Sequence, residues 1–188
     1  FKGTANAVYQ NIKFIKKYDP EYVLILSGDH IYKMNYDIML QEHIENKADC
    51  TIAIIDVPIE EASRFGILST DAKGRVTEFA EKPAHPKSTQ ASMGVYIFST
   101  DALISYLEAD EADPESSNDF GKNIIPKMLA DDQRVFAYLY AGYWRDVGTL
   151  SSFWETNMDL ISEKPPVRLS DNLWKVYYQH SFNPPQYI

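Results

Sequence analysis

The sequence predicts an α/β fold in which a mixed, Rossmann-like β-sheet is flanked by helices. Apolar, β-rich runs at 22–28, 50–57 and 91–98 alternate with segments whose apolar residues recur at helical spacing. Two shorter runs surround the turn sequence DAKG at 71–74, and such a hairpin pairs its strands antiparallel. The sheet should therefore combine parallel and antiparallel strands.

The first half of the chain supplies a helix, a strand and a second helix. The opening residues predict one helix capped by Thr4, with apolar positions at Ala5, Val8, Ile12 and Ile15. The continuous apolar run at 22–28 is typical of a buried parallel strand. A second helix over roughly 36–46 leads to the strand at 50–57 and then to the hairpin.

The second half continues the alternation. After the strand at 91–98, a short helix with Thr100 as its cap and another helix over 121–130 are expected. The run at 134–140 alternates like an edge or half-buried strand. Thr149 can cap a final helix, whose apolar positions are Leu150, Phe153, Trp154 and Leu160.

Composition narrows the class of protein. The chain has 188 residues and 45% hydrophobic content, which is enough for one sizeable core. Its net charge of −9 and the lack of a basic run argue against a nucleic-acid partner. Cys50 is the single cysteine, which excludes an internal disulfide, and no apolar run reaches the ~20 residues of a membrane span. We expect a cytoplasmic protein without a membrane partner.

Four short motifs could meet a ligand: SGDH at 27–30, EKP at 81–83, SNDFGK at 117–122 and YWRDVGT at 143–149. Asp29 and Asp146 each stand between a predicted strand and a loop or helix. Because magnesium is typically held by one or two carboxylates and by substrate phosphates, the two aspartates could share one ion. Each also has a structural alternative, since Asp29 could cap the next segment and Asp146 could stabilise a helix N-terminus.

Other residues of these motifs are weaker signals on their own. Lys82 could be an exposed lysine that ends a strand before a proline, and Trp144 and Tyr96 could belong to the core. His30 lacks a Ser or Cys motif with which it could act as a general base. The sequence also lacks a P-loop, a dinucleotide-binding glycine motif, a metal-spaced His or Cys cluster and a G-x-S-x-G segment. ATPase, dehydrogenase, zinc-enzyme and esterase functions therefore lose support.

Together with GTANAVYQN at 3–11 and ASMGVYIF at 91–98, the four motifs resemble those of ADP-glucose pyrophosphorylases, also called glucose-1-phosphate adenylyltransferases. The resemblance runs along the whole chain. It implies the sugar nucleotidyltransferase fold and transfer of adenylyl from ATP to α-D-glucose 1-phosphate. The products would be pyrophosphate and ADP-glucose for glycogen or starch synthesis. The resemblance also implies a magnesium cofactor and a homotetramer.

The resemblance assigns roles to residues at the matching positions. Asp29 and Asp146 would hold the catalytic magnesium, and Lys82 would complete the catalytic set by contacting the phosphate of glucose 1-phosphate. Glu81 would contact glucose hydroxyls. The other implied residues of the glucose pocket are Ser92, Tyr96, Asp119, Phe120 and Trp144. The implied residues near the adenosine moiety are Gly3, Thr4 and Gly28.

Two parts of the family pattern lie outside this sequence. Its glycine-rich loop of the G-G-x-G-x-R-L type is absent, and the sequence stops before the family's C-terminal left-handed β-helix. We therefore expect a nucleotidyltransferase domain at 1–162, incomplete at its N-terminal end and inactive alone, and a linker at 163–188. Two alternatives stay open: a non-catalytic regulatory subunit of the same fold, and an enzyme that makes another NDP-sugar.

Overall fold

The computed structural model describes residues 1–169, 171, 173–175 and 177. The chain forms two compact units. The large unit comprises Phe1–Gly28 and Met34–Ala141, and the small unit comprises Asp29–Lys33 and the residues from Gly142 onward. The linker predicted at 163–188 lies partly outside the described residues.

The large unit is built on a mixed β-sheet, which confirms the predicted fold class. Its strands run in the order β5-β4-β6-β3-β7, and β1 also pairs with β6. Among the strands that the structure describes in this unit, β3 and β7 pair in parallel, and the other pairs are antiparallel. The strands are β1 (Tyr22–Ile25), β3 (Cys50–Asp56), β4 (Gly66–Thr70), β5 (Val76–Glu81), β6 (Gln90–Ser99) and β7 (Val135–Leu139).

The expectation of a buried parallel strand at 22–28 is wrong for the described chain. β1 covers only Tyr22–Ile25, it pairs antiparallel with β6, and Leu24 is 38% exposed. A continuous apolar run indicates that a strand can be buried on both faces, but it does not indicate whether the neighbouring strand runs parallel or antiparallel to it. The expected hairpin at 65–83 is confirmed as β4 and β5, with Gly74 at a φ of 78° in its turn.

Seven helical segments belong to the large unit in the part of the chain that is described. They are α1 (Thr4–Tyr9), α2 (Ile12–Tyr18), α3 (Tyr36–Glu45), α4 (Ile59–Ala62), α5 (Thr100–Glu111), the π-helix η1 (Phe120–Ile124) and α6 (Ile125–Ala130). The single opening helix that we predicted is therefore two helices. Gly3 rather than Thr4 is the N-cap of α1, and the Thr100 hydroxyl donates to the carbonyl of Pro20 instead of capping α5.

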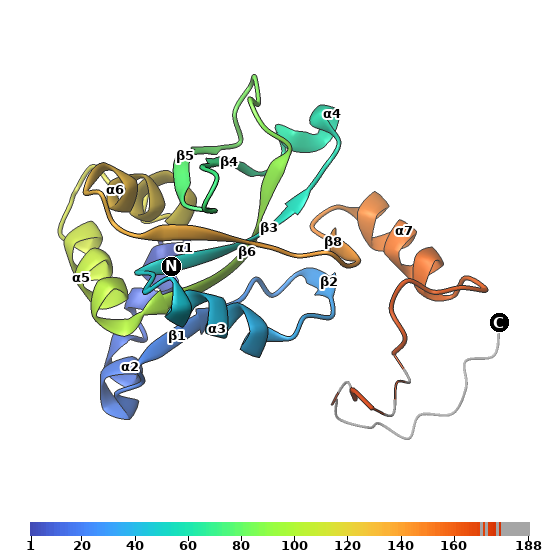
Figure 1. Cartoon of the computed structure of the whole chain (residues 1–188), viewed down its shortest axis with the longest axis horizontal. Helices are drawn as coiled ribbons and strands as arrows, with labels where there is room; N and C mark the ends of the chain where they lie inside the picture. The colour runs from blue at the N-terminus through green and yellow to red at the C-terminus, as the bar shows by residue number, and fades with distance from the viewer. Residues whose placement is uncertain (170, 172, 176, 178–188) are drawn as a thin grey trace. The chain divides into compact units, whose positions relative to one another are not determined.

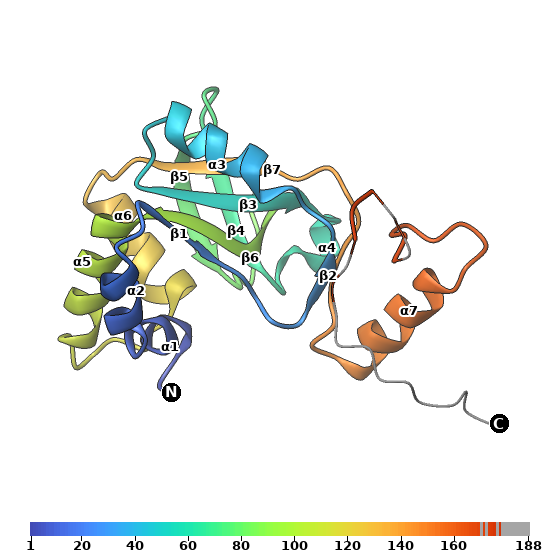
Figure 2. The same ribbon diagram turned by 90° about the horizontal axis from the view of Figure 1, so that it is seen from below.

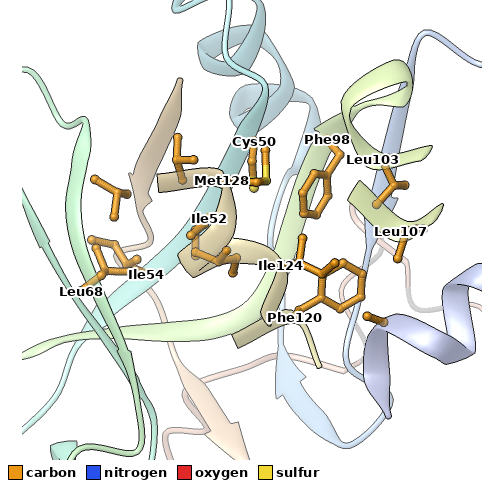
Figure 3. Packing of buried hydrophobic residues seen from close by; sticks show 14 residues of the cluster. Cys50, Ile52, Ile54, Leu68, Phe98, Leu103, Leu107, Phe120, Ile124 and Met128 are labelled. Atoms are coloured by element: carbon orange, nitrogen blue, oxygen red, sulfur yellow. The ribbon is translucent and has the colours of Figure 1, made fainter. Parts of the chain in front are cut away.

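The main core lies between the sheet and the helices α1, α5, η1 and α6. Cys50, Ile52 and Ile54 alternate along β3 and point to this side of the sheet. Figures 1 and 2 show α5 and α6 close together at one end of the sheet. In Figure 3, Phe98 of β6 stands near Phe120 of η1, and their ring centroids are 5.7 Å apart. This packing ties η1 to the centre of the sheet.

Helix α3 covers the opposite face, along β3 and β7 (Figure 2). Thr51, which alternates with the core residues of β3, directs its hydroxyl to His43 of α3 at 2.8 Å. His43 is completely buried, and its second ring nitrogen lies 3.3 Å from the Ser99 hydroxyl. A polar network therefore joins this helix to the sheet.

The small unit contains one strand pair and one helix among its described residues. β2 (His30–Tyr32) pairs antiparallel with β8 (Trp144–Asp146), and α7 spans Leu150–Leu160. Thr149 and Ser152 form a capping box at the start of α7, which confirms the predicted cap at Thr149. The apolar side chains of α7 remain largely exposed, including Leu150, Phe153 and Trp154.

Candidate active site

Asp29 and Asp146 are brought together by the pairing of β2 with β8. Asp29 directly precedes β2, and Asp146 ends β8 opposite His30. The backbone amide of Val147 donates to the carbonyl oxygen of Asp29 at 3.0 Å, and this hydrogen bond joins the chain before β2 to the chain after β8. Two aspartates far apart in the sequence therefore come to the same end of one strand pair.

Gly148 leaves room for both carboxylates. A Cβ at Gly148 would stand 3.0 Å from Oδ1 of Asp146 and 3.7 Å from Oδ2 of Asp29. The Gly148 amide donates to Oδ1 of Asp146 at 2.8 Å and so orients that side chain. The Asp29 side chain is 63% exposed. The pair is thus open to a ligand and partly preorganised.

His30 and Trp144 form the neighbouring part of the same strand pair. Their rings meet edge to face with centroids 5.2 Å apart. Nε2 of His30 lies 3.6 Å from Oδ1 of Asp29, which is beyond hydrogen-bond distance. The structure thus places Trp144 in the unit that holds the two aspartates, whereas the other predicted glucose-pocket residues belong to the large unit.

Asp119 organises the turn that begins η1. Its Oδ1 accepts hydrogen bonds from the backbone amides of Gly121 and Lys122, at 2.9 and 3.0 Å. Its Oδ2 accepts from the hydroxyl of Thr4 at 3.0 Å. Three donors therefore fix the Asp119 carboxylate in one orientation, and a carboxylate has lone pairs left for a ligand hydroxyl.

Thr4 joins the start of α1 to this turn. Its hydroxyl donates to Asp119 and accepts from the backbone amide of Phe120 at 3.1 Å. The backbone at Gly3 can approach Asn118 closely because glycine has no side chain. A Cβ at Gly3 would stand 2.4 Å from the carbonyl oxygen of Asn118. Thr4 therefore contacts Asp119, a residue of the predicted glucose pocket. The predicted roles of Gly3 and Thr4 near adenosine remain predictions.

Glu81 and Lys82 follow each other at the end of β5. The Glu81 side chain is 19% exposed, and its Oε1 lies 3.1 Å from Nζ of Lys82. Lys82 has a φ of 48°, in the left-handed region that non-glycine residues rarely adopt. Its amide donates to the carbonyl of Phe65 at 3.0 Å and holds this conformation in place. A strained residue at a strand end is typical of functional sites.

Tyr96 and Ser92 lie on β6 and continue the same cluster. The Tyr96 ring packs against Phe120 with centroids 5.6 Å apart. Burial raises the pKa of Tyr96 above its ordinary value, a hydrogen bond with Ser92 lowers it, and the charges of Glu81 and Asp119 raise it further. The Tyr96 hydroxyl therefore stays protonated and can donate a hydrogen bond.

The large unit thus gathers acidic, hydroxyl and aromatic side chains from α1, β5, β6 and η1 into one cluster, and comparison with known proteins identifies its family. A family profile described as Nucleotidyl transferase matches residues 1–163. The chain belongs to this family.

Curated relatives of this nucleotidyl transferase are named glucose-1-phosphate adenylyltransferase, as the motifs predicted. The relative from Clostridium perfringens (strain SM101 / Type A) is 60% identical over 188 residues, which is all of this chain and 48% of the relative. Those from Desulforamulus reducens and Geobacillus stearothermophilus are 58% and 56% identical, with 47% and 49% of their lengths covered. The chain spans about half the length of these curated relatives.

The aspartate pair fits a magnesium ion by the chemistry of its donors. Magnesium is bound through one or two carboxylates, while waters and substrate phosphates complete its coordination. Asp29 and Asp146 supply two carboxylates, with the space at Gly148 beside them. Nowhere in the described residues do three or more His, Cys, Asp or Glu side chains gather as a metal site.

Several features of the nucleotidyl transferase site escaped the sequence analysis. The motifs contained Gly121 and Gly148, but we did not assign either of them a role. Gly28, which was assigned one, has no atom within 4 Å of the point where a Cβ would stand. The backbone at Gly28 is therefore open to a ligand. In the described part of the chain, no helix combines the length and apolar character that crossing a membrane requires.

Proposed function

We propose that the whole protein transfers an adenylyl group from ATP to α-D-glucose 1-phosphate, giving ADP-glucose and pyrophosphate, for glycogen or starch synthesis. The observation that carries the proposal is that Asp29 and Asp146 lie at the same end of the β2–β8 strand pair, on either side of the space at Gly148, in a nucleotidyl transferase. The names of the relatives and the Glu81–Asp119 cluster support the sugar phosphate as acceptor.

The reaction requires no nucleophile from the protein. A phosphate oxygen of glucose 1-phosphate forms a bond to the α-phosphorus of ATP, and the bond from that phosphorus to the bridging β-phosphate oxygen breaks. Pyrophosphate leaves with the electron pair. The protein must align two polyanions and offset their charge, which is the positioning and electrostatic work typical of such transfers.

The residues of this chain divide that work. Asp29 and Asp146 would hold magnesium, which supplies positive charge to the phosphate oxygens when it is bound. Lys82 would offset the charge of the sugar phosphate. Glu81 and Asp119 would accept hydrogen bonds from glucose hydroxyls, and Tyr96 would donate one. Ser92 and Phe120 would support Tyr96, and Trp144 would contact the glucose, as its motif implies.

Replacing Lys82 should weaken the binding of the sugar phosphate. We expect Lys82→Ala in the full-length protein to raise KM for glucose 1-phosphate about ten- to a hundredfold, because a charged hydrogen bond contributes roughly 1.5–3 kcal/mol. The KM for ATP should change little. Steady-state kinetics with each substrate varied in turn, and product identified by chromatography, give both constants.

Lys87→Ala is the matched control. Lys87 follows Lys82 closely in the sequence, is 75% exposed and pairs with Glu78 at 2.6 Å, so its loss removes one surface charge only. An unchanged KM for glucose 1-phosphate in Lys82→Ala would contradict the role of Lys82. Absence of ADP-glucose with the wild-type protein would contradict the proposed function itself.

The alternatives are separated by the same assay. A non-catalytic regulatory subunit would form no product with any nucleotide, even at high protein concentration. A uridylyl- or thymidylyltransferase would prefer UTP or dTTP in direct competition with ATP. Retention of Asp29, Lys82 and Asp146 favours the catalytic subunit.

We also propose that the whole protein is a cytoplasmic homotetramer, on the strength of the family resemblance. Light scattering coupled to size-exclusion chromatography measures the mass of the assembly directly. Fractionation of the cells that produce the protein establishes its compartment.

A further inference from the structure

Two glycines of the large unit face the carboxylate of Glu81. A Cβ at Gly66 would stand 2.9 Å from Oε2 of Glu81, and a Cβ at Gly121 would stand 2.5 Å from the same atom. Real Cβ contacts are essentially never shorter than 3.0 Å. Glu81 can therefore keep its observed conformation only while both positions lack a side chain.

The backbone conformation does not explain these glycines. Gly74 and Gly94 have positive φ values, whereas Gly66 and Gly121 do not. Gly66 is the first residue of the strand β4, and Gly121 lies in the helical turn η1, where glycine costs roughly 0.5–1 kcal/mol relative to alanine. Space for a neighbouring group is the remaining physical reason for glycine at both positions.

The carboxylate held between them retains an open acceptor. Oε1 of Glu81 pairs with Lys82, and the Gly121 amide donates to Asp119 rather than to Glu81. No hydrogen-bond donor within the described ranges reaches Oε2. An aligned, partly buried carboxylate oxygen with spare lone pairs suits a ligand hydroxyl.

We propose that Gly66 and Gly121 form a slot that fixes the Glu81 carboxylate so that Oε2 accepts a hydrogen bond from the sugar of the substrate. Gly121 is thus a positioning residue for sugar recognition. The inference rests on the proposed function for the identity of the sugar. The slot itself rests on the contacts of Gly66 and Gly121 alone.

Gly121 is the better of the two positions for a test. At Gly66 an added Cβ would also meet the Phe79 ring at 2.6 Å, so a variant there would disturb packing as well. At Gly121 the close contacts are the Glu81 carboxyl group and, at 3.4 Å, Oδ1 of Asp119. The end of a glutamate side chain can rotate away at little cost, so the fold should tolerate alanine while the carboxylate moves.

We expect Gly121→Ala in the full-length protein to fold with an unchanged or slightly raised melting temperature, because alanine favours helical structure over glycine. Its KM for glucose 1-phosphate should nevertheless rise about ten- to a hundredfold, the effect of losing one charged hydrogen bond. The KM for ATP should stay within about twofold, since Glu81 does not serve the nucleotide. Lys127→Ala, an exposed change on the adjoining helix α6, is the matched control and should alter neither constant.

A double-mutant cycle with Glu81→Gln tests whether Gly121 acts through Glu81. In the wild-type background Glu81→Gln should raise KM for glucose 1-phosphate, and in the Gly121→Ala background it should add almost nothing. Fully additive effects would overturn the inference, because they would mean that Gly121 acts on sugar binding by another route.

A crystal structure of Gly121→Ala separates this inference from the proposed function. A displaced Glu81 carboxylate supports the slot, and an unmoved one overturns it, whatever the activity of the protein. A displaced carboxylate with an unchanged KM for glucose 1-phosphate would overturn the role in sugar recognition. A wild-type protein that forms no ADP-glucose would refute the proposed function and, with it, the identity of the sugar. The crystal structure of Gly121→Ala would still show whether Gly121 fixes the Glu81 carboxylate.

Discussion

Replacing either Asp29 or Asp146 by asparagine in the full-length protein should lower kcat about a thousandfold, because a bound metal supplies several kcal/mol of charge stabilisation in the transition state. Asparagine keeps the shape of aspartate but removes the negative charge that would hold a divalent cation. The magnesium concentration needed for half-maximal activity should rise in any residual activity. Initial rates measured over a range of magnesium concentrations, with chelator as the zero point, give both quantities.

Asp101→Asn is the matched control for this pair. Asp101 is an exposed aspartate in the first turn of α5, so its replacement removes the same charge away from the strand pair. A turnover within about threefold of wild type in Asp29→Asn or Asp146→Asn would contradict the metal role, since that is less than one kcal/mol. Circular dichroism of each variant shows whether the fold is kept.

The second large effect concerns His43, which is buried in its neutral form. Ser99 donates its hydroxyl hydrogen to the carbonyl of Ala48 at 2.9 Å, so it accepts from Nε2 of His43. Nδ1 then accepts from the Thr51 hydroxyl. This assignment satisfies both ring nitrogens without a positive charge. Burial lowers the pKa of His43 to about 4. The charge of Asp49 has a smaller, opposing effect on this pKa, and the charge of Arg134 lowers it further.

Stability should therefore fall as the pH is lowered through the range between the two pKa values of His43. In the unfolded chain the pKa is near 6.5, and in the folded protein it is about 4. The unfolded state binds more protons between these values, so the free energy of unfolding decreases from pH 6.5 toward pH 4. The full contribution is about 3 kcal/mol. Arg134 lowers the pKa of Asp49 below 3.8, so the contribution of that carboxylate is lost only at more acidic pH.

Urea unfolding at a series of pH values between 7 and 4.5 measures this effect in the full-length protein. The matched variant is His43→Gln, which removes the titrating ring, and its unfolding free energy should decline less steeply with falling pH. NMR titration of the His43 ring in the wild-type protein reports the pKa without any substitution. A pKa of 6 or above in the folded protein would contradict the prediction.

Periodicity and turn chemistry predicted most of the fold because they act locally. The hairpin of β4 and β5 was predicted from DAKG, and α7 from the cap Thr149, because each signal lies within a few residues of the element it governs. The opening helix was harder. Its apolar spacing continues through Gln10 and Asn11, where the backbone interrupts the helix, and no proline or glycine marks the break.

The candidate site was predicted in its residue types but not in its contacts. Asp29 and Asp146 were proposed to share an ion from the chemistry of magnesium, and the structure brings both carboxylates close to Gly148. The contact of Thr4 with Asp119 could not be predicted, because it depends on a close approach of Gly3 to Asn118 across the fold. The polar network at His43 was missed for a similar reason, since a single histidine in a helix carries no local signal of its partners.

The contact between Thr4 and Asp119 also has a consequence for biogenesis. The two residues are 115 positions apart, and the strand pair β2–β8 likewise joins early and late parts of the chain. Contacts of such separation close large loops, so they form late and depend on the intervening segment. A nascent chain emerging from the ribosome would therefore display Asp29 long before Asp146 exists. The chain cannot bring these two carboxylates together until synthesis has passed β8, so neither half of the strand pair is sufficient for the site.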